Sequence, residues 1–193
     1  MESISEEEYK KLNDSNKTIK PFSLKGLMKY GKVIDVYDGD TCKVNLLLKD
    51  TITQFTIRMM GYDCPEMKTK NTNEKHFAMR SKQIMSHLVF EKMVKVECLD
   101  FDKYGRLLAN LYCIREDTNE ELNVNQYMID NHLGHPYLGD TKTTFDTLFS
   151  QGYYKEEQSG GGSYPKTISY PLGGIIVPKK TKKWYSFSLR RKN

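Results

Sequence analysis

The sequence lacks several features that mark particular classes of protein. In its 193 residues no apolar run approaches the roughly 20 residues that a helix needs to cross a bilayer. The N-terminal stretch MESISEEEYKKLNDSNK is acidic, whereas a secretory signal would be basic and then apolar. We therefore expect an intracellular protein, in the cytoplasm or nucleus, with no membrane partner. The sequence does not determine the oligomeric state, for which a monomer is favoured.

Cysteine is scarce, and its spacing forms no Cys-x-x-Cys pair. Cys42, Cys98 and Cys113 fall in phase with the apolar positions of predicted strands, which favours small core residues over zinc ligands. His132 and His135 have a ligand-like separation, but no second pair stands near them in the sequence. For these histidines we predict a loop or packing role.

Composition and charge divide the chain into three parts. Hydrophobic residues make up 38% and charged residues 28%, values typical of one globular core with tails. We predict a polar extension over 1–22 with a short helix at EEEYKKL, a folded domain over 23–150, and a flexible basic tail over 151–193. That tail holds nine basic and two acidic residues, so attraction for a polyanion concentrates there.

The central part has the periodicity of strands and then of helices. Apolar alternation and β-branched content predict strands over 32–37, 41–48 and 52–60, with turns at 38–39 and 49–50. These segments read as a three-stranded meander.

Helical spacing of apolar residues follows over 73–90, and strand alternation returns over 93–99 and 107–114. Asn123 can then cap a second helix that ends before Gly134. This order predicts a mainly β fold with two to three helices (α+β), a partly closed five-stranded barrel of the OB type. Such barrels often bind oligonucleotides, although a fold alone does not assign a function.

Three polar loops interrupt the predicted barrel, and each has a purely structural interpretation. DGDT (38–41) suits a tight hairpin turn, and DKYGR (102–106) suits a turn that closes at its glycine. In IRMMGYDCPEMK (57–68) an aspartate stands two residues before a proline and Glu66 follows at once, as at a capped helix start.

Together, however, the three loops resemble the motifs of the staphylococcal nuclease (thermonuclease) family. DGDT comes first, then Arg-x4-Asp-x-Pro-Glu after the third strand, then DKYGR before the fifth, and the resemblance covers about residues 28–140. The predicted barrel also matches the fold of that family. The resemblance implies a calcium-dependent endonuclease that cuts DNA and RNA with little sequence preference and leaves 3′-phosphate products.

The resemblance further implies a calcium site. Asp40 and Asp63 match the calcium-binding carboxylates of the family, and the backbone carbonyl of Cys64 would be a further ligand. Carboxylate and carbonyl oxygens are the ligands that calcium prefers. The family usually has threonine where Cys64 stands, a difference that a ligand carbonyl would tolerate.

The catalytic residues are carried over in the same way. Arg58 and Arg106 match the arginines of the family that bind the scissile phosphate. Glu66 matches the family's glutamate that orients or deprotonates the attacking water. The chemistry calls for such groups, because phosphodiester hydrolysis adds negative charge to the phosphoryl oxygens and the planar guanidinium can hold two oxygens at once. An unperturbed glutamate is ionised at neutral pH. Whether Glu66 is a true base stays open.

For substrate binding, Lys103 and Tyr104 match positions beside the terminal phosphate of the nucleotide, and Tyr137 stands near the base-stacking tyrosines of the family. The segment from Asp40 to Arg58 is longer than the family pattern, and we expect a longer hairpin tip at 48–53 to absorb the difference. Beyond residue 140 the closing helix and tryptophan of the family are not clearly present.

Two questions stay open at this level. A barrel of this family that has lost catalysis can serve as a nucleic-acid or protein binding module, although here the expected ligand set is complete. The basic tail, with PKKTKKW and RRK, can be a nuclear-localisation signal, a non-specific nucleic-acid clamp or a solvated end. Its aromatic residues can stack on bases or fold back on the barrel: Tyr164, Tyr170, Trp184 and Tyr185.

Overall fold

The computed structural model describes residues 3–115, 118–139 and 141–155. Most of the predicted basic tail, with the four aromatic residues named above and both basic motifs, therefore lies outside the described residues. In the described part of the chain, no helix combines the length and the apolar character that a membrane crossing requires.

The N-terminal segment forms one short helix, α1 (Glu6–Asn13), where a helix was predicted. Ser5 caps it: its side chain accepts from the backbone N–H of Glu8, and the Glu8 carboxylate in turn accepts from the backbone N–H of Ser5. The helix buries no side chain, so its local stability comes from this capping box and from surface pairs such as Glu7 with Lys11.

The predicted meander is confirmed as three antiparallel strands, β1 (Met28–Val36), β2 (Thr41–Leu48) and β3 (Thr51–Met59). The β2–β3 pairing continues without a break to the pair Leu48 and Thr51, and Lys49 turns the chain with a φ of 53°. The expected longer hairpin tip was therefore wrong. The additional residues of this hairpin extend the two paired strands and leave the tip tight.

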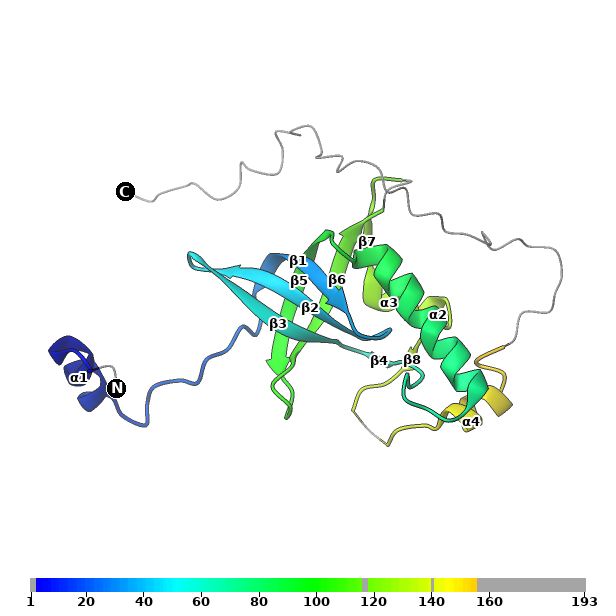
Figure 1. Ribbon diagram of the computed structural model, residues 1–193, viewed down its shortest axis with the longest axis horizontal. Helices are drawn as coiled ribbons and strands as arrows, with labels where there is room; N and C mark the ends of the chain where they lie inside the picture. Colours follow the sequence, from blue (N-terminus) through cyan, green and yellow to red (C-terminus); the bar gives the residue numbers. More distant parts are fainter. Residues whose placement is uncertain (1–2, 116–117, 140, 156–193) are drawn as a thin grey trace. The chain divides into compact units, whose positions relative to one another are not determined.

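Two later strands complete the barrel. β5 (Met93–Phe101) pairs with β1 and with β6 (Leu107–Ile114), and β6 returns to pair in parallel with β3. This last pairing closes the five-stranded mixed barrel of the OB type, which confirms the predicted fold class (Figure 1). A short strand, β7 (Glu121–Asn123), extends the sheet beyond β6.

Two helices cover the core at positions that the sequence indicated. α2 (Thr72–Val89) begins after Asn71, whose side chain accepts from two backbone N–H groups of the first turn. α3 (Val124–Asp130) begins after Asn123, the predicted cap. Because α2 begins at Thr72, the interpretation of Asp63 and Glu66 as a helix start was wrong, and their residue types need another explanation.

Like β7, three further elements were not predicted because they are too short to show a period. β4 (Tyr62–Asp63) pairs with β8 (His135–Pro136), and α4 (Phe145–Ser150) follows them in the chain. α4 packs in an aromatic cluster with α2, in which the Phe77 ring lies 5.3 Å from the Tyr154 ring between centroids.

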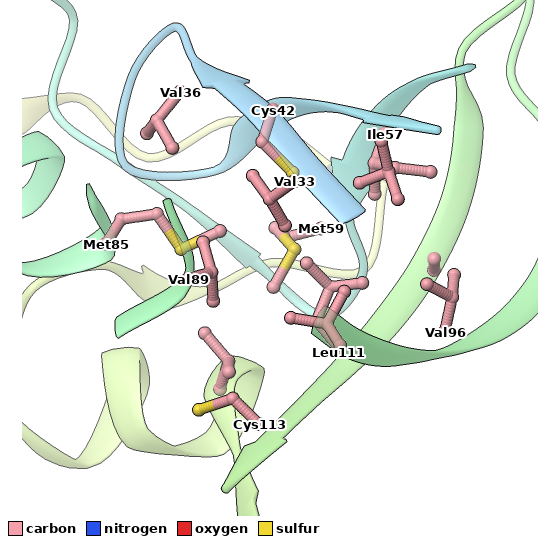
Figure 2. Packing of buried hydrophobic residues seen from close by; sticks show 14 of the residues in the cluster. Val33, Val36, Cys42, Ile57, Met59, Met85, Val89, Val96, Leu111 and Cys113 are labelled. Atoms are coloured by element: carbon pink, nitrogen blue, oxygen red, sulfur yellow. The ribbon is translucent and has the colours of Figure 1, made fainter. Parts of the chain in front are cut away.

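The barrel interior and the buried face of α2 form one continuous hydrophobic core. Figure 2 shows Met85 and Val89 of α2 beside Val33 and Met59 of the barrel, and all four side chains are almost fully buried. The predicted core cysteines are confirmed here: Cys42, Cys98 and Cys113. Small and flexible sulfur-containing side chains fill the space between branched ones.

Asn125 makes the polar connection between α3 and the closed end of the barrel. Its buried side chain accepts from the backbone N–H of Leu111 at 2.9 Å and donates to the carbonyls of Met60 at 2.8 Å and Ala109 at 3.1 Å. One side chain therefore satisfies backbone groups of β6 and of the segment that follows β3.

We expect Asn125→Ala to lower the free energy of unfolding by about 2–4 kcal/mol, because it leaves buried backbone groups without partners. Equilibrium urea unfolding measures this loss. The control is Gln126→Ala, which removes one exposed hydrogen bond to Asp130 and should cost less than about 0.5 kcal/mol. Equal losses in the two variants would mean that other groups replace the Asn125 hydrogen bonds.

Candidate active site

Arg58 lies at the centre of a cluster of acidic side chains at one end of the barrel. Its Nη1 lies 3.0 Å from Asp40 Oδ2, and its Nη2 lies 2.7 Å from Asp63 Oδ1. Nη1 also donates to the carbonyls of Met59 and Tyr62. The three charged side chains are each about nine-tenths buried, so this is a desolvated network rather than a surface ion pair.

Strand register brings the two halves of this cluster together. Thr41 pairs with Arg58 across β2 and β3, and the backbone N–H of Met59 donates to the Asp40 carbonyl at 2.8 Å. On the other side, Asp63 is held by the β4–β8 pairing, opposite His135. Residues 40, 58 and 63 thus meet because two strand pairings end at the same place.

DGDT lies in the predicted hairpin connection between β1 and β2, and its glycine is required there for packing. Gly39 does not need a left-handed backbone, but a Cβ there would lie 2.6 Å from the Cys64 sulfur. The buried Tyr62 hydroxyl also donates to the Gly39 carbonyl at 2.8 Å. The first loop can therefore approach the third-strand loop only with glycine at this position.

Asp40 is buried and held in one orientation. Its Oδ1 accepts from the Thr41 hydroxyl, and its Oδ2 accepts from the backbone N–H of Cys64 at 3.0 Å. Burial raises the pKa of Asp40 to about 7, an effect that the neighbouring Arg58 opposes. A cation that replaces lost hydration would favour the charged form of this carboxylate.

Cys64 contributes through its backbone and its packing. Its thiol is buried, and burial raises the pKa of this thiol well above the ordinary value, so that the neutral form persists. The sulfur lies 3.4 Å from the Leu133 carbonyl. A neutral, enclosed thiol is not a metal ligand, which leaves the predicted role to the backbone carbonyl.

Glu66 reaches the cluster through a residue that the sequence analysis missed. Lys142 Nζ lies 2.6 Å from Glu66 Oε1 and 2.9 Å from Asp63 Oδ2, and so bridges the two carboxylates. Glu66 itself is 62% exposed. No local signal marks Lys142, since it lies in a loop far along the chain from its partners.

The predicted residues of DKYGR form a second, separate group. The Arg106 side chain donates through Nε to Asp102 Oδ2 at 2.7 Å, and its guanidinium lies over the Tyr104 ring with Lys103 on the same ring. Partial burial disfavours the charged form of Asp102, but hydrogen bonds from Arg106 and Tyr104 outweigh it and lower the pKa of Asp102. Asp102, which was not predicted as a site residue, therefore fixes Arg106.

Tyr104 and Tyr137 are available to a ligand to different extents. Tyr104 is 71% exposed, whereas Tyr137 is partly buried and its backbone N–H donates to Gly61 at 2.9 Å. The predicted packing role of the two histidines fits their contacts, because His132 lies edge-on to Tyr153 and buried His135 lies beside the Tyr154 hydroxyl.

The oxygen atoms of the first group suit a hard divalent cation such as calcium. Asp63 Oδ2 is buried and has no well-oriented hydrogen bond, although Lys142 lies close to it. Among the described residues no three His, Cys, Asp or Glu side chains gather into a metal cluster. Carbonyl, water or phosphate oxygens would have to complete the shell around Asp40 and Asp63, as calcium allows.

Comparison with known proteins relates this chain to nucleases. A family model described as "Staphylococcal nuclease homologue" matches residues 56–147. An "Uncharacterized endonuclease" of Escherichia coli O157:H7 is 33% identical over 100 residues, which cover 52% of this chain and 56% of that protein. The chain thus spans about half the length of such relatives.

Two further relatives carry nuclease names. A "Thermonuclease" of Staphylococcus hyicus is 34% identical over 93 residues, 47% of this chain and 53% of that protein. A "Micrococcal nuclease" of Shigella flexneri is 28% identical over 129 residues, 65% of this chain and 67% of that protein. Together with the barrel and the motif order described above, these matches identify a domain of the staphylococcal nuclease family over the matched residues.

Proposed function

We propose that this chain is a calcium-dependent endonuclease that hydrolyses phosphodiester bonds of DNA and RNA with little sequence preference and leaves 3′-phosphate products. The observation that carries the proposal is the buried cluster of Asp40, Arg58 and Asp63 with Glu66 at its edge. It combines hard oxygen ligands, a phosphate-binding cation and a carboxylate in one place.

Both arginines are suited to bind a phosphate in a fixed orientation. Arg58 is held by two carboxylates and two carbonyls, so its positive charge needs no reorganisation when substrate arrives. Arg106 is held by Asp102 through Nε alone, and within the described residues its two terminal nitrogens have no hydrogen-bond partner. In the proposed mechanism these nitrogens contact the phosphoryl oxygens, whose charge grows in the transition state.

Glu66 is suited to handle the attacking water. Its carboxylate is largely exposed, so a water molecule can reach it, and Lys142 keeps it at the edge of the cluster. In the proposed mechanism Glu66 orients this water and accepts its proton as the water attacks phosphorus and the 5′ oxygen leaves.

Calcium, when bound by Asp40, Asp63 and the Cys64 carbonyl, would neutralise charge on the phosphate and polarise it toward attack. The nuclease names of the relatives support the reaction class, but each relative extends well beyond the matched region.

We expect Glu66→Gln to lower kcat by at least about a hundredfold, because the amide cannot accept the proton of the water. An exposed isosteric change leaves the fold intact, which circular dichroism checks. The assay is cleavage of single-stranded DNA and of RNA in excess calcium. Glu120→Gln, which neutralises an exposed carboxylate before β7, is the matched control and should cut at the wild-type rate.

Cleavage by Glu66→Gln at the control rate would exclude Glu66 from the reaction. A folded wild-type protein that binds these nucleic acids but cuts neither in any divalent metal would instead identify the barrel as a binding module.

Metal dependence gives a further prediction. Chelator should abolish cleavage, and calcium should restore it. Asp40→Asn should weaken calcium binding, measured by calorimetry, by at least about tenfold because a charged ligand is lost.

Cys64→Thr should change calcium affinity by less than about threefold, since the side chain packs against Gly39 and Leu133. A large loss of calcium affinity in Cys64→Thr would assign its side chain a direct role.

A further inference from the structure

The ammonium of Lys142 occupies the place between the two carboxylates that face the open side of the cluster. Lys142 lies in the segment between β8 and α4, and its Nζ is 2.9 Å from Asp63 Oδ2 and 2.6 Å from Glu66 Oε1. Its side chain is 48% exposed, so the contact forms at the mouth of the site rather than in the core.

Lys142 is held there as a cation. An ordinary lysine is protonated at neutral pH, and here the hydrogen bond to Glu66 and the ion pair with Asp63 both favour the charged form. At neutral pH the two carboxylates are thus bridged by a full positive charge, and both gain a counter-ion without any metal.

Apart from Lys142, the described residues supply no partner for the Asp63 oxygen that Lys142 contacts. Asp63 Oδ1 is taken by Arg58, and Asp40 Oδ2 is shared between Arg58 and the Cys64 backbone. Asp63 Oδ2 is buried without a well-oriented hydrogen bond, and among the described residues Lys142 is the cation beside it. An incoming metal would therefore meet Lys142 at this oxygen.

Charge opposes simultaneous occupation. Calcium binds carboxylate oxygens at about 2.3–2.6 Å, so a metal on this oxygen would lie within a few ångströms of the ammonium and repel it. With Asp40 ionised, the form that a bound cation favours, the three carboxylates carry a formal charge of −3, and Arg58 with Lys142 supplies +2. A divalent cation that replaces the ammonium neutralises the cluster, whereas one added beside it leaves an excess positive charge. The flexible lysine stem lets the ammonium leave without moving the backbone.

We propose that Lys142 is a built-in competitor of the metal: its ammonium holds Asp63 and Glu66 together in the metal-free site, must be displaced when a divalent cation binds, and so sets the calcium concentration at which the site fills. The inference rests on the proposed function, because it takes Asp63 as a calcium ligand. It adds a residue that opposes metal binding to a set that favours it.

The test is a direct measurement of calcium affinity by isothermal titration calorimetry on the full chain, without substrate. Lys142→Met keeps most of the side-chain length and removes the competing charge, so we expect calcium to bind about five- to tenfold more tightly. Lys142→Arg keeps a competing cation and should bind calcium within about twofold of wild type.

A control variant distinguishes direct competition at Asp63 from the effect of the net charge of the protein. Lys70→Met removes an exposed lysine shortly after Glu66 that does not contact the cluster. It should change calcium affinity by less than about twofold, because charges separated by water are screened. If Lys70→Met tightens binding as much as Lys142→Met does, the effect is one of net charge and the proposal is overturned.

Thermal unfolding supplies an independent readout. In chelator, Lys142→Met should melt below wild type, since Asp63 and Glu66 lose a counter-ion, and calcium should raise its Tm by more than it raises that of wild type. Equal calcium affinity and equal calcium-induced Tm shifts in wild type and Lys142→Met would overturn the competition alone. Failure of all four proteins to take up calcium would overturn the proposed calcium site and the competition together.

Discussion

The candidate site depends on one buried guanidinium that holds two buried carboxylates. Arg58 forms ion pairs with Asp40 and Asp63, and without it these carboxylates would face each other in a desolvated place. The arrangement depends on the pairing of Thr41 with Arg58, because a slip of one residue would turn Arg58 to the opposite face of the strand. The strand register of the barrel therefore also fixes the geometry of the site.

The second arginine is held by independent means. Arg106 has its own acidic partner, Asp102, within one tight turn, whereas Arg58 is fixed by residues from two other loops. Barrel closure relates the two, since Arg58 pairs with Leu108 in the parallel β3–β6 contact, close to Arg106 in the chain. The protein thereby presents two cations at one barrel end without placing them in the same ion-pair network.

The sequence was sufficient for the barrel and for the identity of the central residues, but not for every contact. Long periodic segments predicted the strands and α2, and Asn123 marked the start of α3, because these signals are local. The helix-start interpretation of Asp63 failed because proline and acidic residues suit a helix cap and a polar cluster equally well. The sequence offered no means of choosing until Asn71 was seen to be the cap.

Other contacts had no local signal at all. β4 and β8 contain two residues each, too few for alternation to be recognised. Lys142 contacts partners that are distant in the chain, and a single lysine in a polar loop looks like any solvated residue. Asp102 was visible within DKYGR, but only its geometry reveals that it orients Arg106.

The parallel closure of β3 onto β6 also bears on how the chain acquires its site. Ile57 and Leu107 meet although about 50 residues separate them in the chain, and such a non-local contact costs loop entropy and slows folding. Arg58 and Arg106 take up their relative positions only with that step. A partly folded chain, even one with its first hairpins and helices in place, would therefore hold one arginine but not the pair. If the proposed nuclease activity is present, its emergence during refolding would report closure of the barrel rather than formation of secondary structure.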